Sequence, residues 1–234
     1  MLRDIFELFR KENLLKQAYA RSLEMLEADR EMFLAAVESL REHDDARIEI
    51  DIYAKDQLIN AYEREVRRKV LTHLSVSPGG RNIHPGLVLV SIVIDIERIG
   101  DLTKNIVELA LLHPGKLVCG THETDIRSIE TTVQTMFTLL IEAMPSADSE
   151  KAREVMAEHW WIARRADEIL GALIGHDDPG LPCNEAVSTA LYVRFLKRIS
   201  AHLMNIASSV VNPFDRIGFR DDDPDNLVDG EPLK

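Results

Sequence analysis

Three polar residues recur at every fourth position in the otherwise apolar segment 87–112. They are Glu97, Asp101 and Asn105, and on an α-helix they would lie one above another on a single face. Stacked carboxylates repel each other unless a cation, a basic side chain or a bound proton relieves the repulsion. Because apolar residues fill most other positions of this segment, we expect the polar face to lie between packed helices.

A helical hairpin would bring further acidic residues to this face. The Pro-Gly-Gly sequence at 78–80 predicts a turn between two helical segments. Counting equal distances from that turn places Asp56, Asn60 and, within about one helical turn, Glu63 level with Glu97 and Asp101. Several oxygen atoms that converge on one point favour a hard cation, or a borderline one such as iron or manganese.

Two other interpretations of the polar face stay open. It could be a solvated groove, or its carboxylates could pair with Arg64 or Arg67 of the facing helix. Other chemistry lacks support, because no histidine has a glutamate three positions before it, as a ferritin-like di-iron site would require. Gly-rich phosphate loops and nucleophile motifs are also missing. We therefore predict no enzyme and no organic cofactor.

The composition favours a helical protein of the cytoplasm. The formal charge of −12 argues against nucleic acid as a partner. The longest apolar run, 87–94, is too short to cross a bilayer, so we expect no direct membrane insertion. Cys119 and Cys183 lack a metal-binding spacing and are expected to be ordinary thiols.

Helical periodicity predicts an all-α fold of six long antiparallel helices. The expected helices cover residues 13–43, 46–73, 86–113, 125–144 and 184–211, and a further helix that ends near residue 174 follows a cap at Ser146 or Asp148. They divide the chain into a helical extension, two three-helix units and an acidic tail that we expect to be disordered, with the bounds 1–12, 13–115, 121–212 and 213–234. The extension either packs on the body or docks onto a membrane-bound partner.

The two units form an internal repeat. The sequence Glu-Arg-Ile-Gly-Asp at 97–101 aligns with Lys-Arg-Ile-Ser-Ala at 197–201, and an Asn-Ile pair follows each of them at the same distance. The sequence therefore predicts two tandem three-helix bundles with a shared core. Glycine inside a helix costs about 1 kcal/mol relative to alanine, so we expect a neighbouring helix backbone to approach Gly100 closely.

The tandem units and the Glu-Arg-Ile-Gly-Asp signature resemble the PhoU family of phosphate-signalling regulators. The resemblance covers roughly residues 13–212. It implies a cytoplasmic adaptor that represses phosphate-starvation genes and modulates phosphate uptake. The implied partners are a membrane sensor kinase, the ATPase subunit of a phosphate transporter, or both, and the implied oligomer is a homodimer.

The resemblance also implies candidate metal ligands, because some family members hold metal clusters on acidic motifs of the second and third helices. These candidates are Asp56, Glu97 and Asp101, and Asn60 stands where an acid is expected. Asparagine offers a carbonyl oxygen without charge. We therefore expect one weakened site for Fe, Zn or Mn in the first unit.

The second unit departs further from the family pattern. Ala163, Lys197 and Ala201 stand where acids are expected, and Asp167 alone remains. We expect no second metal cluster there. Two alternative functions remain open: a metal-binding carboxylate bundle for storage or sensing, and an accessory subunit of a different ion or phosphate transporter that docks through residues 1–10.

Overall fold

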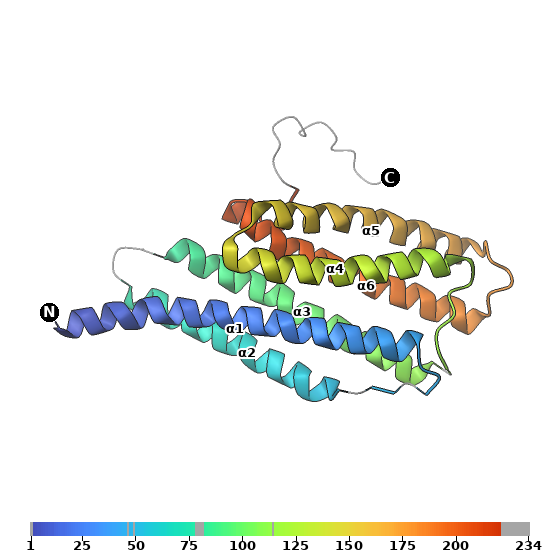
Figure 1. The fold of residues 1–234 in the computed structure, drawn as a ribbon, viewed down its shortest axis with the longest axis horizontal. Coiled ribbons are helices and arrows are strands. Elements are labelled where there is room, and N and C mark those ends of the chain that lie inside the picture. Colours follow the sequence, from blue (N-terminus) through green and yellow to red (C-terminus); the bar gives the residue numbers. More distant parts are fainter. Residues whose placement is uncertain (1, 46, 49, 78–81, 114, 221–234) are drawn as a thin grey trace.

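The computed structural model describes residues 2–220 except 46, 49, 78–81 and 114, and it describes side chains from residue 14 onward. The described residues form six long helices and no strand, which confirms the predicted all-α class (Figure 1). The helices are α1 Leu2–Arg41, α2 Ile52–Val76, α3 Ile83–Leu112, α4 Glu123–Ser146, α5 Ser149–Gly175 and α6 Cys183–Val211, with short 3-10 helices η2 Gly120–His122 and η3 Phe214–Arg216.

Side-chain caps set the start of two helices. The Asp51 carboxylate accepts a hydrogen bond from the backbone N–H of Ala54 at 2.9 Å, so α2 begins at residue 52 and not at the predicted residue 46. Asp148 accepts from the N–H groups of Glu150 and Lys151 and starts α5. Such caps satisfy N–H groups that have no partner within the helix.

The structure differs from the prediction in both end segments of the chain. The backbone of α1 is continuous from Leu2 to Arg41, so the expected extension 1–12 is the first part of α1. How its side chains pack lies outside the described residues. Residues 213–220, which we assigned to a disordered tail, instead fold against α6. There Asn212 donates to the carbonyl groups of Arg216 and Phe219. The rest of the tail, 221–234, lies outside the described residues.

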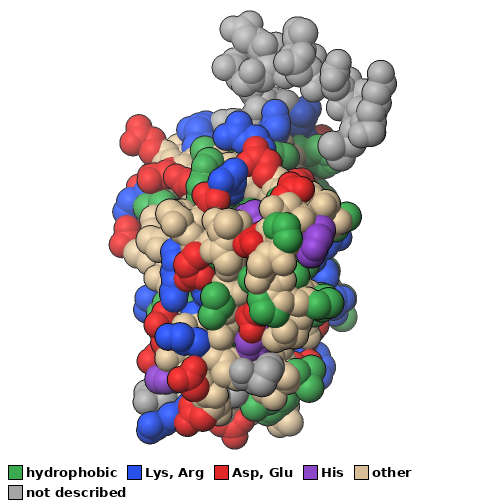
Figure 2. All heavy atoms as spheres, turned by 90° about the vertical axis from the view of Figure 1, so that its right-hand side faces the viewer, with side chains coloured by type: hydrophobic (Ala, Val, Ile, Leu, Met, Phe, Trp, Pro, Cys, Tyr) green, Lys and Arg blue, Asp and Glu red, His purple; other side chains and the backbone are tan. Residues whose placement is uncertain are grey.

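The two predicted units pack along their length. In Figure 1, α1–α3 occupy the lower half of the molecule and α4–α6 the upper half, and α3 packs on α6 while α1 packs on α4. The buried apolar side chains of both units form one continuous core. The end of the bundle in Figure 2 shows acidic and basic side chains interspersed with apolar ones. Within the described residues, no helix combines the length and apolar character that crossing a membrane requires.

A buried ionic network joins the units at the end of α1. The Arg41 side chain is only 1% exposed, and its Nε donates to Glu130 Oε1 of α4 at 2.9 Å. Its other nitrogens donate to the Leu117 carbonyl and to Glu123. The Tyr192 hydroxyl of α6 donates to the same Glu130 oxygen at 2.8 Å. Arg41 thus connects α1, the inter-unit segment and α4 directly, and α6 through Glu130.

We predict that Arg41→Met destabilises the protein by about 3–5 kcal/mol, because Glu130 would remain buried with only the partly exposed Arg127, 3.5 Å away, to neutralise it. Urea unfolding followed by circular dichroism measures this loss. The exposed Arg64 of α2 provides the matched control, and Arg64→Met should change the free energy of unfolding by less than about 0.5 kcal/mol. Equal effects of the two substitutions would contradict the structural role of the network.

Candidate functional site

The α2–α3 hairpin brings the predicted polar residues together. Asp56 of α2 and Asp101 of α3 meet through a lysine, because Lys104 Nζ lies 3.1 Å from Asp56 Oδ1 and 3.2 Å from Asp101 Oδ1. Asn60 Nδ2 lies 3.4 Å from Asp56 Oδ2 and donates to it. The hairpin geometry is therefore as we inferred, but Lys104 was not among the predicted residues.

Glu97 is less well neutralised than its neighbours. Its nearest cation is Arg98, whose Nε lies 3.7 Å from Glu97 Oε2, while Nη1 of the same arginine lies 3.3 Å from Asp101 Oδ2. Burial raises the pKa of Glu97, and the negative charge of Asp101 raises it further. One interpretation expected this face to pair with Arg64 or Arg67, but Glu97 and Asp101 pair with neither of them. Arg67 instead pairs with Glu63, with 2.8 Å between Arg67 Nη2 and Glu63 Oε1.

A buried carboxyl group on α1 completes the site. Asp29 is fully buried, and neither of its carboxyl oxygens has a hydrogen-bond partner among the described residues. Burial raises its pKa well above the ordinary value, and Glu97, Asp56 and Asp101 add to the effect in that order. Asp29 therefore approaches the same acidic group from a third helix, and its surroundings favour the neutral form of its carboxyl group.

Gly100 makes room for Asp29. A Cβ atom at position 100 would lie 2.9 Å from Asp29 Oδ1 and 3.3 Å from Ile59 Cδ1. We expected a helix backbone to approach this glycine, but two side chains do so instead. The reason is that α1 and α2 converge on α3 here, and the space beside Gly100 accommodates the Asp29 carboxyl group.

Sequence reasoning missed Asp29, although a signal was present. The buried residues of α1 recur at helical spacing, and Asp29 falls within that apolar series between Leu26 and Phe33. Charged residues are rarely buried unless they are paired. An acid at an apolar position of a helix that packs beside an acidic face therefore marks a candidate site residue.

The second unit has a lysine in the corresponding region. Lys197 Nζ of α6 lies 2.6 Å from Asp167 Oδ1 of α5. Ser200 aligns with Gly100 and donates its hydroxyl hydrogen to the Lys197 carbonyl at 2.8 Å. That leaves the hydroxyl oxygen to accept from His159 Nδ1 at 2.9 Å. Burial, and then the charge of Lys197, lowers the pKa of His159 to about 4, so this histidine is neutral.

These side chains, as arranged, do not fit the expected Fe, Zn or Mn ion. Among the described residues, no three His, Cys, Asp or Glu side chains are grouped so that they could hold a metal. The Lys104 ammonium lies between Asp56 and Asp101, where a bridging metal ion would have to sit. The four predicted residues, Asp56, Asn60, Glu97 and Asp101, thus form an acidic face that a lysine neutralises in part.

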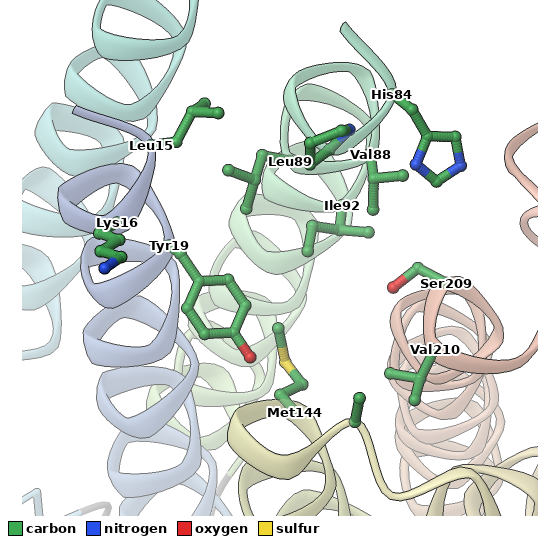
Figure 3. Close-up of a pocket in the computed structure, with 12 residues that line it drawn as sticks. Leu15, Lys16, Tyr19, His84, Val88, Leu89, Ile92, Met144, Ser209 and Val210 are labelled. Carbon is green, nitrogen blue, oxygen red and sulfur yellow. The ribbon is translucent and has the colours of Figure 1, made fainter. Parts of the chain in front are cut away.

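A separate cavity lies where α1, α3, α4 and α6 meet, with a volume of about 470 Å³. Its walls are largely aliphatic, and Tyr19 points from α1 toward Met144 of α4 (Figure 3). Burial raises the pKa of Tyr19, so its hydroxyl group is neutral. The cavity is therefore suited to apolar groups, and no sequence pattern predicted it.

Comparisons with known proteins identify the family. The family model of the PhoU domain matches this chain twice, over residues 22–110 and 126–210. The chain belongs to the PhoU family. These matches lie within the two predicted units, and Asp29, Asp56, Glu97 and Asp101 all fall inside the first.

Two solved structures share the fold. PhoU from Pseudomonas aeruginosa superposes with a TM-score of 0.75 at 23% identity, over 86% of this chain and 96% of that chain. A second PhoU, from Streptococcus pneumoniae, has a TM-score of 0.63 at 16% identity, over 88% and 94% of the two chains. No curated protein matches the sequence.

We predict that Asp29→Asn stabilises the protein at neutral pH by about 1–3 kcal/mol, because the amide cannot ionise and so removes the cost of keeping a carboxyl group with a raised pKa inside the folded protein. The folded protein holds a proton on Asp29 that the unfolded chain releases above pH 3.8, the ordinary value. Wild-type stability should therefore fall relative to the variant as pH rises from 4 toward the raised pKa of Asp29.

Thermal unfolding of both proteins between about pH 4 and 8 measures this difference. Asp45 is exposed, so Asp45→Asn serves as the control and should show no such pH-dependent difference from the wild type. A destabilised Asp29→Asn at pH 8, with the control unchanged, would show that the carboxylate has a stabilising partner.

Proposed function

We propose that this protein is a non-enzymatic regulator of phosphate transport and of the phosphate-starvation response. The observation that carries the proposal is the PhoU-domain match to both three-helix units. The structural neighbour from Streptococcus pneumoniae is described as a phosphate transport system regulatory protein. In this proposal the protein is an adaptor of the cytoplasm that keeps starvation genes repressed while phosphate is plentiful.

Its partners in this proposal are a membrane sensor kinase and the ATPase subunit of a phosphate transporter, and the protein itself is a homodimer. Regulation then depends on contacts between helical surfaces. A suitable surface is the apolar stripe formed by Ile83, Leu87 and Ile94 along α3, whose side chains are 47%, 40% and 39% exposed. The spacing of four and seven residues places them on one side of the helix, and a partner helix could cover them.

Two other functions remain as alternatives with less support. A protein for metal storage or sensing would need ligands free to coordinate, whereas Lys104 already bridges Asp56 and Asp101. An accessory to a different ion or phosphate transporter would use the first part of α1 for docking, and those side chains lie outside the described residues.

Deletion of the gene tests the proposal directly. We expect high alkaline phosphatase activity in a deletion strain grown with ample phosphate, because repression of the starvation genes would be lost. Complementation with the full chain should restore low activity. Normal activity at both high and low phosphate would contradict the regulatory role, and co-purification from membranes would then identify which transporter the protein serves.

Charge placed on the α3 stripe tests the contact surface. The double variant Leu87→Asp/Ile94→Asp should raise alkaline phosphatase activity to about the level of the deletion strain, because a carboxylate buried in a protein interface is strongly unfavourable. Ile174 of α5 is 85% exposed, so Ile174→Asp is the control and should complement fully. Circular dichroism of both purified variants checks that they fold. Full complementation by the folded double variant would exclude this stripe as the contact surface.

A further inference from the structure

Four exposed residues form a stripe along the N-terminal half of α6. Val187 and Leu191 are 56% and 44% exposed. The exposed Arg194 and Arg198 continue the same side of the helix at spacings of three and four residues. Neither guanidinium group forms an ion pair or a hydrogen bond with another described residue. This α6 stripe therefore offers two apolar side chains and two unpaired cations to a binding partner.

The segment that follows α6 turns back along the same side of the helix. The Gly218 N–H donates to the Ser208 hydroxyl group at 2.7 Å, and a Cβ atom at Gly218 would lie 3.2 Å from Asn205 Oδ1. Positions 205 and 208 continue the three- and four-residue spacing of the α6 stripe. The chain has therefore already reversed its direction at Gly218, where it lies on α6.

Arg220 extends this contact further along the helix. Its guanidinium group lies over the Trp160 ring of α5, with 4.1 Å between Arg220 Cζ and the ring centroid, which is a favourable cation–π arrangement. Trp160 follows His159, whose Nδ1 lies 2.9 Å from Ser200 Oγ of α6. The side chain of Arg220, the last described residue, therefore reaches the level of Ser200, close to the end of the α6 stripe.

We propose that the acidic tail, residues 221–234, binds along the α6 stripe of its own chain. The tail contains six acidic residues and one lysine, so its charge is opposite to that of the two arginines. The order of its residues also matches the stripe. Four of the acids precede the aliphatic pair Leu227-Val228. From Gly218 toward the start of α6, the stripe likewise presents its arginines first and its apolar residues afterwards.

The length of the tail places the matching groups level with each other. An α-helix rises about 1.5 Å per residue, so the two arginines lie about 13–19 Å along α6 from the level of Gly218, and the two apolar residues about 23–29 Å. An extended chain rises about 3.3 Å per residue, so residues 222–225 reach about 13–23 Å and residues 227–228 about 30–33 Å. The acids therefore meet the arginines, and the aliphatic pair meets the apolar residues, to within about one helical turn.

The covalent connection makes weak contacts sufficient for binding. A single exposed ion pair contributes little, and the polar composition of the tail gives it no core of its own. Because the tail is joined to the end of α6, however, its effective concentration at the stripe is about millimolar. The tail then shields the two apolar side chains from water, and an external partner of the α6 stripe would have to compete with it.

Distance measurements by electron paramagnetic resonance on the full chain test this proposal. Cys183 is an exposed thiol one helical turn before Val187, and Cys119 is buried, so nitroxide labels are placed on Cys183 and on Gly230→Cys. A bound tail should give a narrow distance distribution below about 25 Å. An unbound tail should give a broad distribution near about 35 Å, because Gly218 lies about that far from the start of α6.

Reversal of charge on the stripe should remove the short distance. In Arg194→Glu/Arg198→Glu the acidic tail would meet two further carboxylates, so the distribution should become broad. Arg64 and Arg68 of α2 are also exposed and four residues apart. The matched control Arg64→Glu/Arg68→Glu should therefore keep the short distance. Circular dichroism checks that both variants fold.

Reversal of charge on the tail provides the reciprocal test. Asp222→Lys/Asp223→Lys/Asp225→Lys should remove the short distance from the otherwise unchanged chain and restore it in Arg194→Glu/Arg198→Glu. If the α6 variant does not fold, the tail variant alone decides, since its substitutions lie outside the helical bundle.

Three results would overturn the proposal. The first is a broad distribution in the labelled chain without charge reversal. The second is a short distance that persists in the folded Arg194→Glu/Arg198→Glu variant. The third is a short distance that disappears when excess unlabelled chain is added, which would assign the tail to the stripe of a second copy. All of these measurements use purified protein, so they are independent of the proposed regulatory function.

Discussion

Carboxyl groups buried between helices have to be neutralised within the protein, because moving an unpaired charge out of water is very costly. The structure meets this requirement in three ways. Glu130 pairs with the buried Arg41, Asp56 and Asp101 share Lys104, and the pKa of Asp29 is raised by its burial. The two ionic contacts also connect the helices that carry the groups, so in these two places the neutralisation of charge and the packing of the bundle depend on each other.

Helix α1 connects the ionic junction to the acidic face. Arg41 lies at its end, where it contacts α4 and the inter-unit segment, and Asp29 lies three turns earlier, against α3. The ionic junction and the acidic face are therefore built on one continuous helix that packs on both units.

The sequence predicted the α2–α3 part of the site well. Spacing of four residues along α3, and equal counting from the turn at 78–80, placed Asp56 and Asn60 level with Glu97 and Asp101, and in the structure Lys104 contacts both Asp56 and Asp101. The lysine that neutralises these carboxylates in part was not predicted, because Lys104 lies one residue before Asn105 and is not at one of the four-residue positions of the polar face. Its flexible side chain reaches the site from there. Asp29 was missed for a different reason. Its helix position was apparent, but its approach to Gly100 depends on how α1 packs against α3.

The sequence by itself determined the helical class, the tandem units and the family, because these follow from local periodicity and from a motif that repeats after 100 positions. The exact starts of the helices became clear only from the structure, in which Asp51 caps α2 and the helix begins at Ile52. Only the tertiary structure decided that Arg41 joins the units, that a cavity lies between them and that Lys104 bridges Asp56 and Asp101. These features depend on the distances between side chains from different helices, and periodicity along one helix carries no information about such distances.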